Sequence, residues 1–235
     1  PENPETYDGF AAAVDGLAEA CADLETPVVG GNVSLYNDSE SGPIPPTPTL
    51  AVLGTKEPGE TPPAAVSGEG DLLLVEPAAY QAGSAVGSDD PHALGGSLLL
   101  SQFGGSDQFP GLPADPAGLV GALTRVAALD STLATHDVSD GGLAVTLAEL
   151  VTADAGVDAT VDSGAALFAE TAGRVVVEST APDAVREAVS DDATVTALGT
   201  ATDSGSLDLS VGADRLTYDT EELAALRSVL ESALD

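Results

Sequence analysis

A glycine pair followed by an amide and a hydroxyl is the part of this sequence best suited to chemistry. The run is Gly30, Gly31, Asn32, Val33 and Ser34, and it lies between two short apolar runs. Glycine backbone lets a phosphate approach the main chain closely, and an asparagine oxygen is a hard ligand for Mg²⁺. The hydroxyl of Ser34 can donate a hydrogen bond to a substrate oxygen. These residue types suit a site for phosphate and a divalent ion, although composition alone favours an ordinary turn after a strand.

A second motif, HDVSDGGL from His136 to Leu143, lies between a predicted strand and a predicted helix. Adjacent histidine and aspartate, His136 and Asp137, suggest acid–base or metal chemistry. However, neighbouring strand residues point to opposite faces and rarely form one site. Ser139 or Asp140 can instead cap the following helix. The structural interpretation is therefore favoured for this motif.

Two shorter motifs leave both interpretations open. The LGGS run at residues 94–97 precedes a possible helix at residues 97–103, so it is either an anion nest or a plain junction between loop and helix. In LFAETAGR, residues 167–174, Glu170 and Arg174 form either a local ion pair or a pair that faces a ligand. The sequence has two histidines and one cysteine, so neither a Ser/His/Asp triad nor a Cys/His metal site can be assembled from it with confidence.

The composition is that of a folded protein with a very acidic surface. Lys and Arg total 6 against 39 Asp and Glu, which gives a formal net charge of −33. Because 43% of the residues are hydrophobic, disorder is a poorer explanation than adaptation to high salt, where ions screen the repulsion between carboxylates. We expect a halophilic source and a loss of stability at low salt. The same charge argues against a nucleic-acid partner.

The sequence also limits the compartment. A single cysteine, Cys21, excludes an internal disulfide. No apolar run approaches the 18 residues of a membrane span and no signal peptide is visible, so we expect a cytoplasmic protein. The chain has no Met and starts at Pro1, and we therefore expect it to be part of a longer protein.

Hydrophobic periodicity predicts a layered α+β protein in two parts. The first part has a helix at residues 6–25 and short strands at 28–29 and 49–53, and residues 55–69 are rich in proline and glycine, as expected for a linker. The second part mixes helices and strands without strict alternation. Its predicted strands are 71–76, 133–138, 157–161, 174–178, 195–198, 207–211 and 215–218, and its predicted helices are 97–103, 117–129, 141–154, 182–189 and 221–234.

Six segments, in this order, closely resemble the C-terminal part of the large-subunit type of phosphoribosylformylglycinamidine synthases, which act in purine biosynthesis. They are PENPETYDGFAAAVDGLAEAC, TPVVGGNVSLYNDSESGPIPPTPTLAVLG, GDLLLVE, LGGS, HDVSDGGLAVTLAEL and LFAETAGRVVVE. The resemblance extends from Pro1 to about Tyr218. It implies that residues 1–54 end a second AIR synthase N-type, ATP-binding domain and that 55–69 form a linker. Residues 70–219 are then a second AIR synthase C-terminal-type domain, and 220–235 are a C-terminal helix.

The resemblance also implies an activity and roles for particular residues. The family converts formylglycinamide ribonucleotide to its amidine with ATP, Mg²⁺ and glutamine-derived ammonia, and works with a glutaminase subunit and a small accessory subunit. Gly31 matches the ATP-contacting glycine, Asn32 the Mg²⁺ ligand and Ser34 the substrate contact. The family's catalytic histidine and its remaining metal ligands precede this chain, so we expect no catalytic residue here and no activity alone. Glu170 begins a segment in which the family's Glu-Ser-Gln is altered, so that substrate role is not carried over.

Two alternatives remain open from the sequence. One is another ATP-dependent member of the same superfamily, similar to aminoimidazole ribonucleotide synthetase, selenophosphate synthetase or the hydrogenase-maturation ATPases. Those families lack the GGNVSLYN run found here. The other is a structural half that binds an inert nucleotide and takes no part in catalysis, which the altered segment at residues 170–172 favours for part of the chain.

Overall fold

The computed structural model describes residues 4–34, 38–39, 42–56, 61–81 and 90–228, which belong to two compact units. Unit 1 is Pro1–Gly59 and unit 2 is Glu60–Asp235. Unit 1 contains helix α1 (Pro4–Asp23) and a small antiparallel pair, β1 (Asp38–Ser39) with β2 (Gly42–Pro43). The remaining described residues of unit 1 have no regular secondary structure.

The predicted helix of unit 1 is confirmed, but its two predicted strands are wrong. Residues 28–29 and 49–53 are not assigned to any strand. A strand exists only when a neighbour accepts and donates its backbone hydrogen bonds, and no described segment of unit 1 pairs with either stretch. Their apolar side chains consequently lie in solvent, and Val29 and Leu53 are 96% and 99% exposed.

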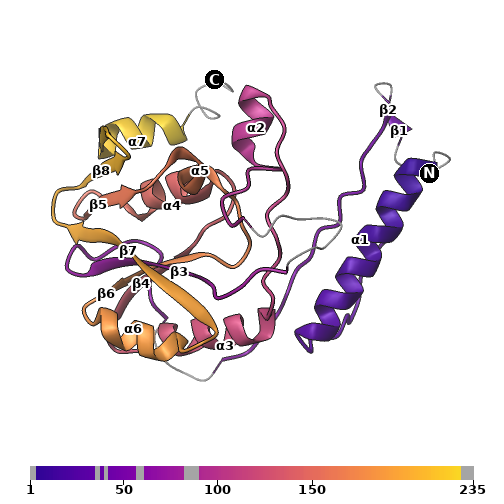
Figure 1. Ribbon diagram of the computed structural model, residues 1–235, viewed down its shortest axis with the longest axis horizontal. Coiled ribbons are helices and arrows are strands. Elements are labelled where there is room, and N and C mark those ends of the chain that lie inside the picture. The colour runs from indigo at the N-terminus through magenta and orange to yellow at the C-terminus, as the bar shows by residue number, and fades with distance from the viewer. Residues whose placement is uncertain (1–3, 35–37, 40–41, 57–60, 82–89, 229–235) are drawn as a thin grey trace. The chain divides into compact units, whose positions relative to one another are not determined.

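Unit 2 is built on one seven-stranded sheet with the order β4-β6-β3-β7-β5-β8-β9 (Figure 1). Neighbouring strands are antiparallel except for β5 and β8, which are parallel. The mixed sheet with helices on its faces confirms the predicted α+β class. The strands are β3 (Asp71–Pro77), β4 (Thr132–Asp137), β5 (Gly156–Val161), β6 (Val175–Ser179), β7 (Ala193–Thr202), β8 (Ser206–Val211) and β9 (Asp214–Asp219).

Helices lie on both faces of this sheet (Figure 1). On one face are α4 (Gly142–Leu150), α5 (Gly164–Phe168) and α7 (Thr220–Arg227). On the other are α3 (Pro116–Ala127) and α6 (Pro182–Val189), which pack against each other. A short helix, α2 (Leu98–Phe103), belongs to the loop region between β3 and α3.

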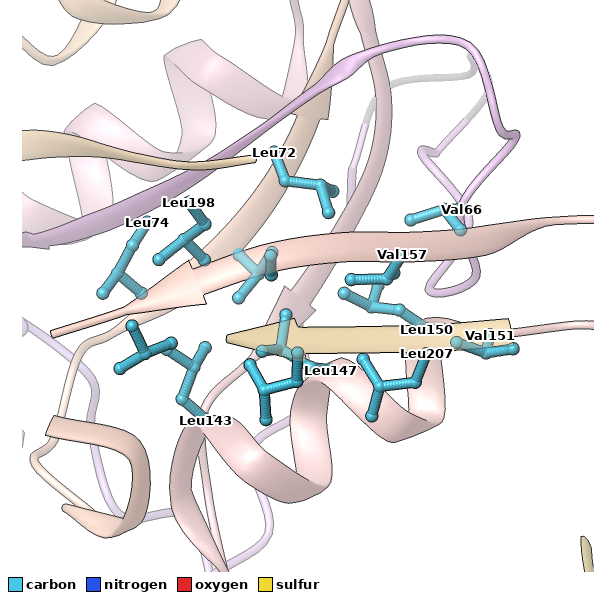
Figure 2. Close-up of a cluster of buried hydrophobic side chains, with 14 of the residues drawn as sticks. Val66, Leu72, Leu74, Leu143, Leu147, Leu150, Val151, Val157, Leu198 and Leu207 are labelled. Carbon is cyan, nitrogen blue, oxygen red and sulfur yellow. The ribbon is translucent and has the colours of Figure 1, made fainter. Parts of the chain in front are cut away.

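The core explains why β3 is apolar at four consecutive positions. Leu72 and Leu74 belong to the hydrophobic cluster on the α4 face, while Leu73 and Val75 belong to the cluster on the α3 face. Alternate strand residues point to opposite faces, so a strand covered on both sides needs an uninterrupted apolar run. Figure 2 shows the larger cluster, in which Leu143 and Leu147 of α4 face the sheet.

Most predicted elements of unit 2 are present within two residues of their expected ends. Strand β7 continues to Thr202, four residues beyond its predicted end, because it pairs with both β3 and β5. Helix α4 ends at Leu150, four residues early. Beyond it, Thr152 donates its amide to the carbonyl of Ala155 and accepts the amide of Ala155 on its hydroxyl, which closes a turn. Helix α5 was not predicted, because five residues are too few to show a helical period. The predicted end of the last helix, from residue 229 onward, lies outside the described residues.

A buried carboxylate fixes the entry to β3. Glu178 of β6 is 1% exposed and accepts hydrogen bonds from the amides of Ser67, Gly68, Glu69 and Gly70 at 2.7–3.1 Å, and from the Ser67 hydroxyl at 2.8 Å. A buried carboxylate is costly unless such donors surround it. Gly70 is required here, because a Cβ at this position would lie 2.8 Å from Cγ of Glu178. The end of the expected linker is therefore an ordered part of unit 2.

Replacement of Glu178 by alanine should lower the free energy of unfolding by at least ~3 kcal/mol, because four amides and a hydroxyl lose their acceptor. Glu178→Gln keeps one oxygen for these donors and should cost less. Urea denaturation monitored by circular dichroism in molar KCl measures both changes.

The matched control for this prediction is Glu187→Ala on the exposed side of α6, which should change stability by less than about 0.5 kcal/mol. Equal effects of the two alanine substitutions would show that the buried carboxylate does not stabilise the fold.

Candidate functional site

The predicted glycine–amide–hydroxyl run lies in unit 1, and part of it borders a groove. The groove has a volume of about 550 Å³, and Asn32 and Ser34 both line it. Phe10, Val14 and Leu17 of α1 also line it, together with residues 44–49. These α1 residues are spaced four and three positions apart, so they lie on one face of the helix. The groove thus combines apolar side chains with four neutral polar ones, those of Asn32, Ser34, Thr47 and Thr49.

Gly31 does not line the groove, and nothing in the described chain requires a glycine there. A Cβ at Gly30 or Gly31 would meet no atom within 4 Å. Neither residue is among those of the described chain with positive φ. Of the three predicted site residues, the structure therefore brings Asn32 and Ser34 to one surface and leaves the backbone of Gly31 beside it, exposed.

The donor set suits a partial site for Mg²⁺ and phosphate. The amide oxygen of Asn32 and the hydroxyl of Ser34 are exposed, and no hydrogen bond joins either side chain to another described residue. An amide oxygen is a suitable single ligand for Mg²⁺, which normally also takes carboxylates, phosphates and water. Among the described residues, no group of three or more His, Cys, Asp or Glu side chains could hold a metal ion. Asn32 can thus contribute one ligand and cannot complete a metal site with these residues.

In unit 2 the carboxylate of Glu170 joins three motifs that are far apart in the sequence. Its Oε1 accepts the amide of Leu98, the first residue of α2, and the amide of Gly141, the N-cap of α4, each at 2.8 Å. Ser97 accepts the amide of Leu100 and caps α2 from its own side. Negative charge is favourable where helix amides have no partner within the helix. The LGGS segment is consequently a junction between loop and helix whose first helical amide is already satisfied.

Glu170 and Arg174, the pair suggested by the sequence, do not interact. Arg174 is 2% exposed and pairs through Nε with Oε1 of Glu76 at 2.9 Å, and it also donates to the carbonyl of Ala169 at 3.1 Å. Burial and the nearby Glu76 carboxylate raise the pKa of the Tyr80 phenol to about 12, while Arg174 opposes the shift. The Tyr80 hydroxyl is buried and has no hydrogen-bond partner among the described residues. The Arg174 ion pair is therefore a structural element of the core.

The HDVSDGGL motif has the structural role that the sequence favours, but its predicted cap is wrong. Gly141 is the N-cap of α4, with φ of 82°, and no side chain caps it. The hydroxyl of Ser139 instead donates a short hydrogen bond to Oδ2 of Asp137. His136 lies beside Asp137 and places Nε2 3.4 Å from Oε2 of Glu149. Ser139 and Asp140 precede the N-cap, and Ser139 accepts the amide of Gly142 on its backbone carbonyl, so neither side chain caps the helix.

The pKa of Asp137 is held below its ordinary value, first by the Ser139 hydroxyl and to a smaller extent by His136, while partial burial opposes the shift. Sequence reasoning missed the buried Glu178 and the partly buried Glu76 as partners of other groups in the core. Each follows directly on three or more apolar strand positions, in LLLVE and VVVE, and this placement was the available signal.

Comparison with protein families gives two matches along the chain. Residues 68–212 match the model described as AIR synthase related protein, C-terminal domain, and residues 1–55 match AIR synthase related protein, N-terminal domain. The first match alone covers more than half of the 235 residues.

The chain is similar over its full length to subunits from salt-adapted organisms that are called phosphoribosylformylglycinamidine synthase subunit PurL. It is 55% identical to the protein of Natronomonas pharaonis, 52% to that of Haloarcula marismortui and 40% to that of Salinibacter ruber. In each case all of this chain aligns with 32% of the relative. The chain thus spans about a third of the length of these curated relatives.

Among solved structures, the complex of Thermotoga maritima PurL with AMPPCP has a TM-score of 0.50 and 12% sequence identity, and the match covers 70% of this chain and 27% of that one. This likeness concerns the fold. No helix among the described residues is both long enough and apolar enough to cross a membrane.

Replacement of Ser139 by alanine should raise the pKa of Asp137 toward its ordinary value, because the hydroxyl that stabilises the carboxylate is removed. A carboxyl whose folded pKa is depressed contributes stability above its unfolded pKa of about 3.9, and that contribution is lost as the pH falls through the folded value. The variant should therefore lose less stability than the parent between pH 4 and pH 2. Titration of the carboxyl carbon by NMR measures the pKa directly.

The control for this titration is Ser101→Ala in α2, an exposed serine that makes no hydrogen bond to Asp137, and it should leave the curve unchanged. An unaltered Asp137 titration in Ser139→Ala would show that the short hydrogen bond is not the cause.

Proposed function

Because the chain belongs to the AIR synthase related protein family, we propose that it is the C-terminal part of a phosphoribosylformylglycinamidine synthase large subunit. Identity of 50–55% to haloarchaeal subunits of that name supports the proposal. In it, residues 1–54 end the second N-type domain, 55–69 connect the domains, 70–219 form the second C-terminal-type domain, and 220–235 add a C-terminal helix. The acidic composition fits the same group of organisms.

The proposed reaction is the ATP-dependent conversion of formylglycinamide ribonucleotide to formylglycinamidine ribonucleotide. ATP phosphorylates the amide oxygen, and glutamine-derived ammonia then displaces phosphate and forms the new C–N bond, which makes the protein a ligase. Such a reaction depends mainly on alignment of the phosphates and neutralisation of their charge. Mg²⁺, when bound, supplies part of that neutralisation. A chain of net charge −33 needs such a cation, or backbone amides, to hold a nucleotide.

The groove of unit 1 is the observation that carries the proposed roles. Asn32 would give its amide oxygen to Mg²⁺, and Ser34, on the same groove, would donate its hydroxyl to the substrate. The backbone of Gly31 would lie against ATP. The space around Gly31 is open and its backbone conformation does not require a glycine, so its lack of a side chain is consistent with a ligand that approaches the main chain. In unit 2, Glu170 accepts the first amide of α2 and the amide of Gly141, the N-cap of α4, which supports a structural role for that segment.

The chain supplies one wall of the site, and we infer that the remaining ligands, the acid–base histidine and the glutaminase and small accessory subunits are contributed from outside it. The 235-residue chain, assayed with ATP, ammonia and formylglycinamide ribonucleotide in molar KCl, should release no ADP above background. Turnover near that of the full-length subunit would contradict the proposal that the other ligands and the acid–base histidine lie outside this chain.

In the full-length subunit, Asn32→Ala should lower kcat/KM by at least ~10-fold and raise the Mg²⁺ concentration needed for half-maximal nucleotide binding, because a metal ligand is removed. Asn32→Asp retains an oxygen ligand and should recover part of the Mg²⁺ affinity. Calorimetric titration of nucleotide at several Mg²⁺ concentrations separates metal binding from catalysis.

The matched control is Val28→Ala, four residues away, which is exposed and does not line the groove, and it should leave Mg²⁺ dependence unchanged. If Asn32→Ala turns over like the parent at limiting Mg²⁺, Asn32 is not a metal ligand in the working site.

A further inference from the structure

The groove of unit 1 is bordered by neutral side chains. Asp and Glu make up 39 of the 235 residues, yet none of the described residues that line the groove is charged. A carboxylate repels a nearby anion, and few cations are present in this chain to oppose that repulsion. In a chain of net charge −33, a groove without carboxylates is therefore a surface on which an anion can bind.

Four side chains of this groove carry hydrogen-bond donors, those of Asn32, Ser34, Thr47 and Thr49. The Thr47 hydroxyl donates to the carbonyl of Pro45 at 3.0 Å, so its single proton is already used. The Thr49 hydroxyl belongs to an exposed residue and makes no hydrogen bond to another described residue. Thr49 thus adds a third available donor to those of Asn32 and Ser34.

The segment that carries Thr49 is stiff and has few backbone donors. Proline occupies positions 45, 46 and 48, so three of the six residues from 44 to 49 have no amide hydrogen. Each proline also fixes its own φ and restricts the residue before it to extended backbone. Such a segment loses little conformational entropy when a ligand binds. The available side-chain donor of this segment, the hydroxyl of Thr49, is therefore held on a preorganised backbone.

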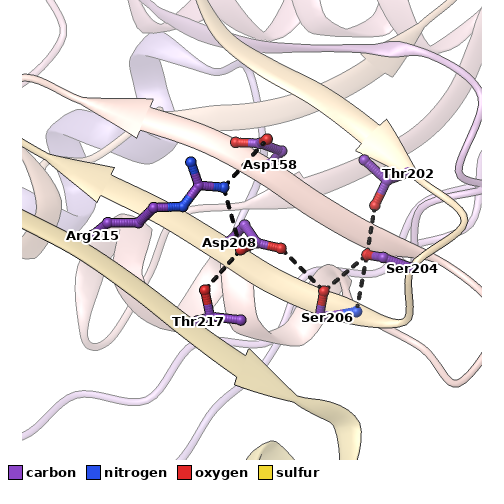
Figure 3. A network of polar contacts seen from close by, with 7 residues as sticks. All are labelled: Asp158, Thr202, Ser204, Ser206, Asp208, Arg215 and Thr217. Carbon is purple, nitrogen blue, oxygen red and sulfur yellow. Dashed lines mark hydrogen bonds and ion pairs between the residues drawn. The ribbon is translucent and has the colours of Figure 1, made fainter.

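Hydroxyl groups of unit 2 are arranged differently, as Figure 3 shows. Ser206 and Thr217 donate their hydroxyls to the carboxylate of Asp208 at 3.2 and 2.7 Å. The hydroxyl of Ser204 shares hydrogen bonds with those of Thr202 and Ser206 at 2.8 and 2.9 Å. This network is satisfied within the chain and is centred on a carboxylate, so it is unsuited to an anion. The Thr49 hydroxyl has neither restriction.

We propose that the hydroxyl of Thr49 donates a hydrogen bond to a phosphate group of the ligand that occupies the groove, beside Asn32 and Ser34. Ionised phosphate oxygens are acceptors, which matches free donors on a surface without carboxylates. The volume of about 550 Å³ is in the range of small-molecule sites. The inference rests on the proposed function, under which the phosphate is either the triphosphate of ATP or the 5′-phosphate of formylglycinamide ribonucleotide.

The test uses the full-length subunit with Thr49→Val, which removes the hydroxyl and keeps the branched shape of the side chain. Because a hydrogen bond to a charged group is lost, the KM for at least one of the two ligands should rise by at least ~10-fold. A rise for ATP identifies the bound group as the triphosphate, and a rise for the ribonucleotide identifies it as the 5′-phosphate. Thr49→Ser retains the hydroxyl and should restore the parent KM. Calorimetric titration of each ligand measures the same loss as a Kd.

Thr55→Val is the matched control for this experiment. Thr55 is an exposed threonine of unit 1 that does not line the groove and makes no hydrogen bond to another described residue. Its replacement should leave both KM values unchanged, and circular dichroism establishes that all the variants are folded. If Thr49→Ser does not restore the KM, the proposal is overturned, since loss of the methyl contact would then be the cause.

Unchanged KM and Kd values in Thr49→Val overturn the proposal as well. If Asn32→Ala raises the Mg²⁺ requirement while Thr49→Val behaves as the parent, the role of Thr49 is rejected and the proposed function of the groove stands. If both variants behave as the parent, the groove is not the ligand site, and the inference and the proposed function fail together.

Discussion

The Glu178 carboxylate is the interaction on which unit 2 depends, because it connects the start of the central strand to the strand beside it. Five donors of residues 67–70 converge on this one side chain of β6, and β3 begins at the next residue. β3 is buried on both faces and pairs with β6 and β7, so its register decides the position of both apolar clusters. A shift of one residue would exchange the two clusters. The hydrogen bonds to Glu178 fix the first residue of β3 and so exclude that shift. The apolar side chains of β3 are similar to one another and cannot by themselves distinguish the two registers.

The same principle applies to the buried Glu178 and to two partly buried carboxylates of unit 2, Glu76 and Glu170. Glu178 accepts backbone amides, Glu76 pairs with Arg174, and Glu170 accepts the first amide of α2 and the amide of the residue that precedes α4. In unit 2 the amides that could hold a phosphate at these helix starts are thus engaged by the chain itself. In unit 1 the Asn32 and Ser34 side chains have no such internal acceptor or donor among the described residues. Unit 2 thus uses these polar groups to stabilise its own fold, whereas in unit 1 these two polar side chains are available to a ligand.

The sequence predicts the strands of unit 2 well because each is bounded by turn residues and backed by an apolar cluster. The strands predicted at residues 28–29 and 49–53 are wrong, because a β-strand forms only where a neighbouring strand pairs with it and no described segment does so. It also predicts a side-chain cap for α4 that is absent, because the N-cap position is taken by Gly141, whose amide is held by Glu170, 29 residues further along the chain. For the candidate site, residue types and the family resemblance point to Gly31, Asn32 and Ser34, but only coordinates show that two of them share a groove with α1.

The one parallel pair in the sheet, β5 with β8, has a consequence for the order of folding. β5 ends at Val161 and β8 begins at Ser206, so everything between them is synthesised before the two can meet. Contacts between distant residues form slowly because a long loop must close first. Until the β8–β9 hairpin arrives, β5 is itself the edge of the sheet, beside β7. A nascent or truncated chain that ends before residue 206 therefore exposes an apolar strand edge, and this is the stage at which aggregation is most favoured.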